Sequence, residues 1–181
     1  MKTVTFLDFD GVICDSIQEC YTVANLTYYN KQDNSKKHQD LFYKYRGLVG
    51  PVYQYLALLI LVDSLLDKEL LDSFENIKLE FNRILELIPM NELNDFEHKF
   101  FETRKLLQQN ISQWLALNPL TRFGKMLESR TLEDVVIVST KNERSIQIIL
   151  DFYDITKGAT YDWAGMLLSQ FLSFRIKQKV D

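Results

Sequence analysis

A short apolar strand followed by two closely spaced aspartates constrains the fold of this 181-residue chain more than any other feature. Residues 3–16 read TVTFLDFDGVICDS. The first half of this segment favours a strand, whereas Asp8, Asp10 and Gly11 break strands, so we expect a strand that ends near Asp8 and turns at Gly11. Side chains two residues apart on an extended chain point the same way, so the two carboxylates converge. Because such carboxylates repel each other unless a cation lies between them, the segment predicts a magnesium site held by Asp8 and Asp10.

A second strand is expected much later in the chain, at residues 135–138. Four consecutive β-branched residues, VVIV, are typical of a strand buried on both faces of a parallel sheet. The polar residues Ser139 and Thr140 follow this strand directly. Taken alone, a serine at position 139 favours a cap between a strand and a helix over a functional role.

Together, these two segments resemble the first two motifs of the haloacid dehalogenase superfamily of phosphohydrolases. The resemblance implies that Asp8 is the nucleophile that forms an aspartyl-phosphate intermediate, and that Asp10 is the general acid and base. It further implies that Mg²⁺ binds to Asp8 and Asp10, the latter through its backbone carbonyl, and that Gly11, Ser139 and Thr140 bind the phosphoryl group. The implied fold is α/β, with a Rossmann-like parallel sheet core and an inserted α-helical cap.

Two further motifs of that superfamily are expected downstream of the second strand. The third is a lysine that balances the charge of the phosphoryl group, and Lys177 is preferred here over Lys157 and Lys179. The fourth is a pair of acids that follows another apolar strand and completes the metal shell. The chain offers only Asp162 and Asp181 in this region, and neither follows such a strand. The absence of that strand would leave the first strand at an exposed edge, so we expect either a sheet that is incomplete at its C-terminal end or another element that covers this edge.

The segment between the two strands is predicted to be helical almost throughout. We expect residues 1–16 and 133–181 to form the α/β core and residues 17–132 to form the cap, as in the subgroup that contains phosphoglycolate phosphatase and β-phosphoglucomutase. The apolar run at residues 55–62 is too short to span a membrane and is predicted to be a buried helix. Residues 94–117 are predicted to form one further helix.

The sequence also predicts the character of two other segments of the cap. Residues 31–40, KQDNSKKHQD, lack apolar periodicity and are predicted to be a polar loop, and no role is assigned to His38. Residues 42–51 alternate aromatic and basic side chains before two glycines and resemble the segment of the cap that faces the substrate. The guanidinium group of Arg46 is a candidate for binding a second anionic group of the substrate.

Composition limits the classes of partner. A net charge of -4 argues against non-specific binding to nucleic acid, for which a basic surface is expected. The two cysteines, Cys14 and Cys20, form neither a CxxC nor a zinc pattern, which is typical of a reducing compartment. With no secretory signal evident, we expect a cytoplasmic protein with no membrane partner.

The sequence thus predicts a Mg²⁺-dependent phosphohydrolase that acts on a small phosphorylated metabolite. Two alternatives stay open. One is a phosphomutase of the same fold, in which Asp8 returns the phosphoryl group to another position of a sugar. The other is a truncated, non-catalytic relative that lacks the fourth motif. The oligomeric state is not predicted.

Overall fold

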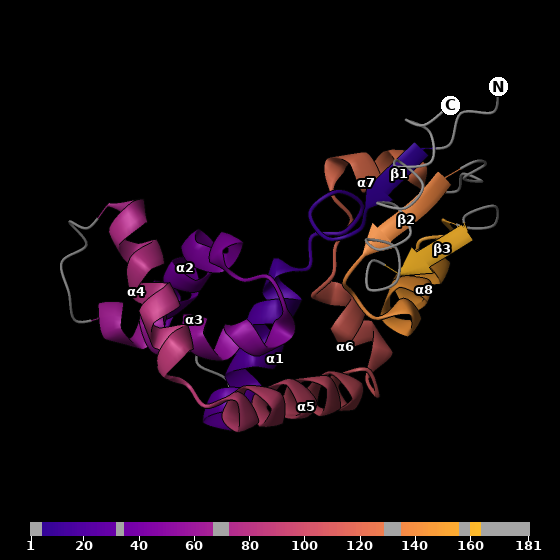
Figure 1. Ribbon diagram of the computed structural model, residues 1–181. Coiled ribbons are helices and arrows are strands. Elements are labelled where there is room, and N and C mark those ends of the chain that lie inside the picture. The colour runs from indigo at the N-terminus through magenta and orange to yellow at the C-terminus, as the bar shows by residue number, and fades with distance from the viewer. Residues whose placement is uncertain (1–4, 32–34, 67–72, 129–134, 156–159, 164–181) are drawn as a thin grey trace, which may run out of the picture. The chain divides into compact units, whose positions relative to one another are not determined.

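The computed structural model describes residues 5–31, 35–66, 73–128, 135–155 and 160–163. The chain divides into two compact units (Figure 1). One unit combines residues 1–16 with residues 118–181 and contains the sheet, and the other consists of residues 17–117 and is helical. The predicted cap extended to residue 132, whereas the helical unit ends at residue 117.

The predicted Rossmann-like sheet core was wrong. The described residues are mostly helical, with eight α-helices, and their parallel sheet has only three strands of four or five residues: β1 (Thr5–Asp8), β2 (Val135–Ser139) and β3 (Thr160–Trp163). The expectation of a larger sheet came from the family resemblance. The segment between β1 and β2 folds into helices, as the helical spacing of its apolar residues predicted, and among the described residues only β3 adds to the two predicted strands.

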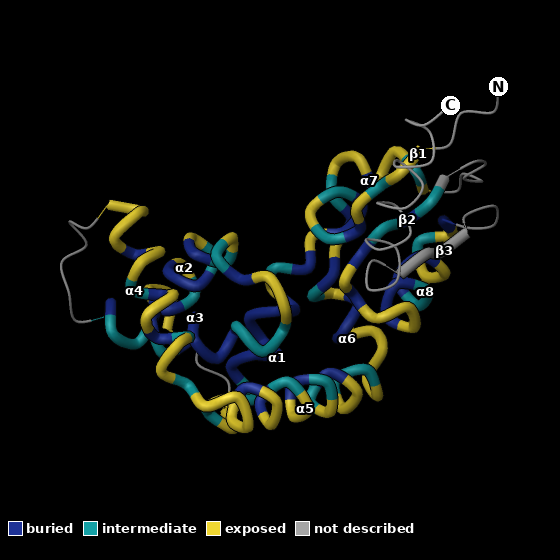
Figure 2. The backbone as a smooth tube through the Cα atoms, viewed as in Figure 1, coloured by how far each residue is buried: buried dark blue, intermediate teal, exposed yellow. Residues whose placement is uncertain are grey.

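The three strands lie in the order β1-β2-β3, so β1 forms an edge of the sheet within the described part of the chain. β1 and β2 are parallel, with Thr5 opposite Val135 and Asp8 opposite Val138. Ile137 is buried, whereas Val136 and Val138 are half-buried, so β2 is less enclosed than its sequence predicted (Figure 2). Because the strands are parallel and in register, the residues that follow Asp8 and Val138 emerge at the same edge of the sheet.

A tight loop follows β1 and is anchored on its own backbone. The amides of Ile13 and Cys14 both donate hydrogen bonds to the carbonyl of Phe9, at 3.0 and 2.9 Å, and all three side chains are fully buried. Gly11 adopts a φ of 83°, in the left-handed region that favours glycine. The loop therefore has a defined shape, with the glycine at the position where the turn requires it.

The short helix α7 (Arg122–Leu127) packs against this loop within the sheet-containing unit. The amide of Thr121 donates to the carbonyl of Ile13 at 3.0 Å, and the Thr121 hydroxyl also donates to the loop, at the carbonyl of Val12. A Cβ atom at Gly124 would lie 2.0 Å from the Ile13 carbonyl oxygen. The close approach of α7 to the loop therefore requires glycine at this position.

The helical unit is built around α3 (Tyr55–Leu66), which contacts three other helices. Most of its side chains are buried, which confirms the buried helix predicted from the apolar run at residues 55–62. Among the described residues, no helix combines the length and apolar character that crossing a membrane requires. The other helices of this unit are α1 (Ile17–Tyr29), α2 (Lys36–Tyr45), α4 (Phe74–Leu87), α5 (Met90–Leu107) and α6 (Ile111–Ala116), with 3₁₀ turns η1 (Arg46–Leu48) and η2 (Val52–Gln54).

Two predictions for this unit were wrong in detail. The single helix predicted at residues 94–117 is divided into α5 and α6, because the side chain of Asn110 accepts a hydrogen bond from the amide of Gln113 and starts a new helix. The polar stretch at residues 31–40 is not a loop throughout. Ser35 caps the start of α2 in the same way, through the amide of His38.

His38 is fully buried, although no role was assigned to it from the sequence. Its Nδ1 lies 3.1 Å from the hydroxyl of Tyr21, and its Nε2 lies 3.2 Å from the hydroxyl of Tyr29. Tyr29 in turn donates a hydrogen bond to Asp63 at 2.7 Å. A neutral imidazole protonated on Nε2 satisfies every one of these contacts, since Tyr21 then donates to Nδ1 and Tyr29 accepts from Nε2. His38 therefore joins α1, α2 and α3 as a structural residue.

A buried ion pair links α1 to α5. The guanidinium group of Arg104 donates to both carboxylate oxygens of Glu19, at 2.6 and 3.0 Å, and the indole nitrogen of Trp114 donates to the same carboxylate at 3.2 Å. Glu19 and Trp114 are fully buried, and Arg104 is nearly so. Buried charges are tolerated when they are paired and hydrogen-bonded, as here. This network fixes three helices of the unit together.

Candidate functional site

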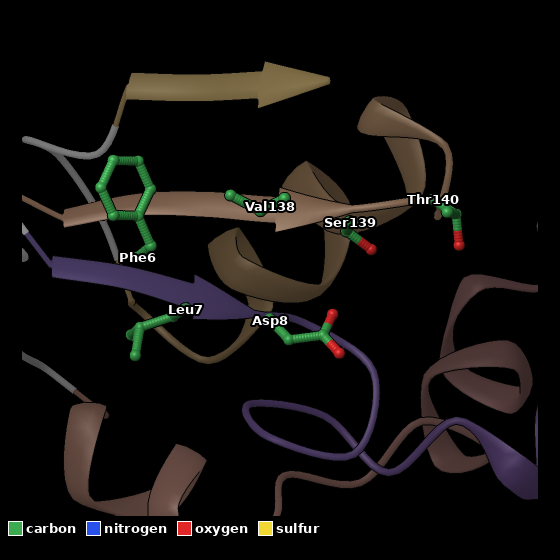
Figure 3. A pocket seen from close by; sticks show the side chains of 6 residues that line it. All are labelled: Phe6, Leu7, Asp8, Val138, Ser139 and Thr140. Carbon is green, nitrogen blue, oxygen red and sulfur yellow. The ribbon is translucent and has the colours of Figure 1, made fainter. Parts of the chain in front are cut away.

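Asp8 and Ser139 lie at the carboxyl ends of two neighbouring strands. Asp8 is the last residue of β1 and Ser139 the last residue of β2, and the register places Asp8 opposite Val138. Both side chains line one pocket of about 350 Å³, and Figure 3 shows their oxygen atoms beyond the ends of the strands. The remaining lining residues are Phe6, Leu7, Val138 and Thr140. The structure thus places in one pocket three of the residues that the resemblance had implied.

The carboxylate of Asp8 is exposed and held by the backbone that follows it. Its Oδ1 accepts a hydrogen bond from the amide of Phe9 at 2.7 Å. Partial burial raises the pKa of Asp8 above its ordinary value of 3.8, and the nearby charge of Asp10 raises it further, while hydrogen bonds from the amides of Phe9 and Asp10 lower it. The raised pKa identifies Asp8 as a carboxylate that is less well solvated than one in water.

Asp10 contacts a lysine that sequence reasoning missed. The ammonium group of Lys141 lies 3.3 Å from Oδ1 of Asp10, and the side chain of Lys141 is only 2% exposed. The backbone amide of Lys141 also donates to the hydroxyl oxygen of Ser139 at 3.0 Å. A signal was present in the sequence, because Lys141 follows Ser139 by two residues at the end of a predicted strand. The contact with Asp10, however, joins residues that are far apart in the chain.

The hydroxyl of Ser139 takes part in a turn and keeps a hydrogen for a ligand. Its oxygen accepts the amide of Lys141, as expected for a turn between a strand and a helix. Asn142 then caps the helix α8 (Glu143–Phe152) through a hydrogen bond from the amide of Ser145. A hydroxyl that accepts one hydrogen bond still has its own hydrogen to donate. The turn and a phosphate-binding function of Ser139 are therefore compatible.

The donor set suits a magnesium ion bound mainly by water and substrate. Asp8 supplies a carboxylate to the pocket, and Mg²⁺ is commonly bound through one or two carboxylates together with substrate phosphate and several waters. Within the described ranges, no group of three or more His, Cys, Asp or Glu side chains could hold a metal ion. These residues alone thus do not form a complete metal shell, and a Mg²⁺ ion held by Asp8 would take most of its ligands from water and substrate.

Gly11 and Arg46 are not among the described residues that line this pocket. Gly11 shapes the loop after β1. Arg46 belongs to the helical unit, where its guanidinium group donates to the carbonyl of Val49 at 2.9 Å and stacks over the ring of Tyr55, 4.9 Å from the ring centre. Lys177 lies outside the described residues. Asp162 falls within β3, a strand that the sequence did not predict.

Near this pocket, Cys14 provides a buried thiol. Its Sγ lies 3.4 Å from the carbonyl oxygen of Asn118 and 3.4 Å from the hydroxyl oxygen of Ser16. Burial raises the pKa of the Cys14 thiol from an ordinary value of 9.0 to about 11, although Ser16 and the charge of Lys141 lower it. Cys14 is therefore a neutral packing residue at physiological pH.

The chain matches no known family model, no curated protein and no solved structure.

Proposed function

We propose that this chain is a Mg²⁺-dependent phosphohydrolase that acts on a small phosphorylated metabolite. One observation carries the proposal: Asp8 and Ser139 end adjacent parallel strands and line the same pocket, with Asp10 two residues after Asp8. This arrangement supports the resemblance to the haloacid dehalogenase superfamily, which was based on the sequence around the same residues. It supplies a nucleophile, a hydroxyl donor and a second acid in one region.

The first chemical step transfers the phosphoryl group to Asp8. A carboxylate oxygen of Asp8 attacks phosphorus, the bond from phosphorus to the ester oxygen breaks, and Asp10 gives its proton to the departing oxygen. The Ser139 hydroxyl donates to a phosphoryl oxygen, where negative charge is spread in the transition state. The products of this step are the alcohol and an aspartyl-phosphate on Asp8.

The second step returns the enzyme to its starting state. A water molecule attacks phosphorus of the aspartyl-phosphate, and Asp10, now a carboxylate, takes the proton from that water. The bond from phosphorus to Asp8 breaks, which releases inorganic phosphate and the free Asp8 carboxylate. When bound, Mg²⁺ neutralises part of the negative charge that Asp8, Asp10 and the phosphoryl group bring together.

The pocket favours a small substrate. A volume of about 350 Å³ is near the lower end of the range of roughly 300–1,000 Å³ that is usual for ligand sites. Leu7 and Phe6 provide apolar surface beside the polar strand ends. A phosphate ester with a short carbon skeleton fits these dimensions.

Phosphate release from p-nitrophenyl phosphate, measured with and without Mg²⁺, tests this function. Wild-type protein should release phosphate, and Asp8→Asn or a chelator should abolish the release, because the amide is not a nucleophile and the metal is needed. Asp95→Asn is the matched control. Asp95 lies in α5, and its side chain is exposed and paired with Lys99 on the same helix. Equal, background-level release by wild type and Asp8→Asn would contradict the proposal and favour a non-catalytic protein.

A further inference from the structure

Lys141 combines a buried position with a positively charged group, and this combination needs an explanation. Its side chain is 2% exposed, whereas lysine is almost never fully buried unless it is paired. Transfer of an ammonium group out of water is costly without compensation. The side chain of Asp10, which is 34% exposed, provides the compensation through a contact of 3.3 Å.

The contact spans two separate segments of the site. Lys141 lies between the end of β2 and the start of α8, and its amide is held by the Ser139 hydroxyl. Asp10 lies in the loop after β1, where the carbonyl of Phe9 accepts hydrogen bonds from the amides of Ile13 and Cys14. The contact between the Lys141 ammonium group and Asp10 therefore links the loop after β1 to the turn that contains Ser139.

We propose that Lys141 is the positioning residue of the site, whose ammonium group holds the Asp10 carboxylate where it exchanges a proton with the ester oxygen and with water. This inference rests on the proposed phosphohydrolase function. The contact engages Oδ1 of Asp10 and leaves Oδ2 outside it. The partly exposed side chain of Asp10 can adopt several orientations. An ion pair with the buried ammonium group of Lys141 selects one of them.

A purely structural ion pair would behave differently from a positioning pair. Loss of a structural pair would lower stability and slow all substrates alike. Loss of a positioning pair affects above all the substrates whose leaving group needs a proton from Asp10. Phenyl phosphate and p-nitrophenyl phosphate are similar in size, but phenoxide is the more basic leaving group and depends more on that proton.

Steady-state hydrolysis of these two esters, with Mg²⁺ present, separates the two possibilities. Lys141→Met keeps the volume of the side chain and should lower kcat for phenyl phosphate roughly tenfold or more. General acid catalysis typically accelerates a reaction about 10²–10⁴-fold, and the variant should lose part of this acceleration. Its effect on p-nitrophenyl phosphate should be several-fold smaller. Asp10→Asn should show the same preference more strongly, and Lys141→Arg should restore most of the activity. Lys99→Met, at an exposed lysine of α5, is the matched control for loss of charge.

Amide hydrogen exchange in the loop gives a second readout that does not require turnover. Lys141→Met and Asp10→Asn should each reduce protection at the amides of Ile13 and Cys14, which bond to Phe9. The double variant should lose no more protection than either single variant, because both remove the same contact.

The outcomes distinguish this inference from the proposed function. If wild type is active but Lys141→Met slows both esters equally, or neither, the positioning role is wrong while the phosphohydrolase stands. If wild type is inactive but exchange shows the coupling, the contact between Lys141 and Asp10 is a structural one, and both the proposed function and the positioning role are wrong. If Lys141→Met leaves exchange at Ile13 and Cys14 unchanged, the inference is overturned whatever the activity.

Discussion

The Cys14 thiol shows how strongly burial controls the chemistry of a single residue beside the candidate site. Its side chain is fully enclosed, and its pKa is raised to about 11. Alkylating reagents attack the thiolate and need access to sulfur. A low reactivity is therefore expected from both the pKa and the burial of this residue.

We predict a loss of stability at alkaline pH that depends on Cys14. The folded thiol keeps its proton up to a pH of about 11, whereas the unfolded thiol loses it near 9.0, so the unfolded state binds fewer protons between these values. The free energy of unfolding should then fall as pH rises from about 9 to 11, and be unaffected by this group below that range. Urea denaturation at pH 8 and pH 10.5 of a Cys20→Ala protein, with and without Cys14→Ala, measures this.

The alkaline loss should be smaller in the protein that lacks Cys14. An identical loss with and without Cys14 would contradict the prediction. Iodoacetamide labelling of the Cys20→Ala protein supplies a check, because the folded protein should be modified far more slowly than the protein unfolded in urea.

At the scale of the elements, the ion pair between α1 and α5 should carry a large energetic effect. Arg104→Met leaves the Glu19 carboxylate buried without the guanidinium charge that balances it, and breaking a buried ion pair in this way typically costs about 3–5 kcal/mol. Urea denaturation should show this loss in the free energy of unfolding. The same measurement on Arg83→Met, which breaks a surface pair with Glu80, should show almost no change.

Replacing both partners tests the physical reason for that loss. Because the cost arises from an unpaired buried charge, Glu19→Met combined with Arg104→Met should recover a substantial part of the stability lost in Arg104→Met alone. A double variant that is less stable than Arg104→Met would show that the ion pair itself, rather than the orphaned charge, is the source of the effect.

Gly124 connects α7 to the loop that contains Asp10. Because a Cβ atom at this position would lie 2.0 Å from the Ile13 carbonyl, Gly124→Ala must displace either α7 or the loop. We expect a loss of about 1–3 kcal/mol, typical of overpacking, together with reduced phosphate release. Gly47→Ala is the matched control, since a Cβ atom there meets nothing within 4 Å. Equal stability and activity of the two variants would contradict the assigned role of Gly124.

At the scale of the whole molecule, sequence reasoning succeeded where local patterns decide the structure. The strand ending at Asp8, the strand ending at Ser139 and the buried helix α3 all follow from residue types and spacing within short windows. The two strand ends lie at the same edge of the sheet because parallel strands in register must place them there.

Features that depend on distant contacts were missed. Lys141 follows Ser139 closely in the sequence, but nothing in the residues around it indicates its contact with Asp10. Thr160–Trp163 contains Asp162 and no apolar run, so β3 was not expected. The Rossmann-like sheet was predicted from the resemblance rather than from strand patterns in the chain, and it was wrong for that reason.

The division of the sheet-containing unit into residues 1–16 and 118–181 determines the order in which the candidate site can be built during protein synthesis. β1 leaves the ribosome first, yet its partner β2 is made only after residues 9–134. Translation proceeds at about 5–20 residues per second, so β1 lacks its neighbouring strand for roughly 6–25 seconds after Asp8 is made. The helical unit is complete in sequence during this interval. The pocket that holds Asp8 and Ser139 is therefore assembled only once β2 has been made, long after the strand that supplies Asp8.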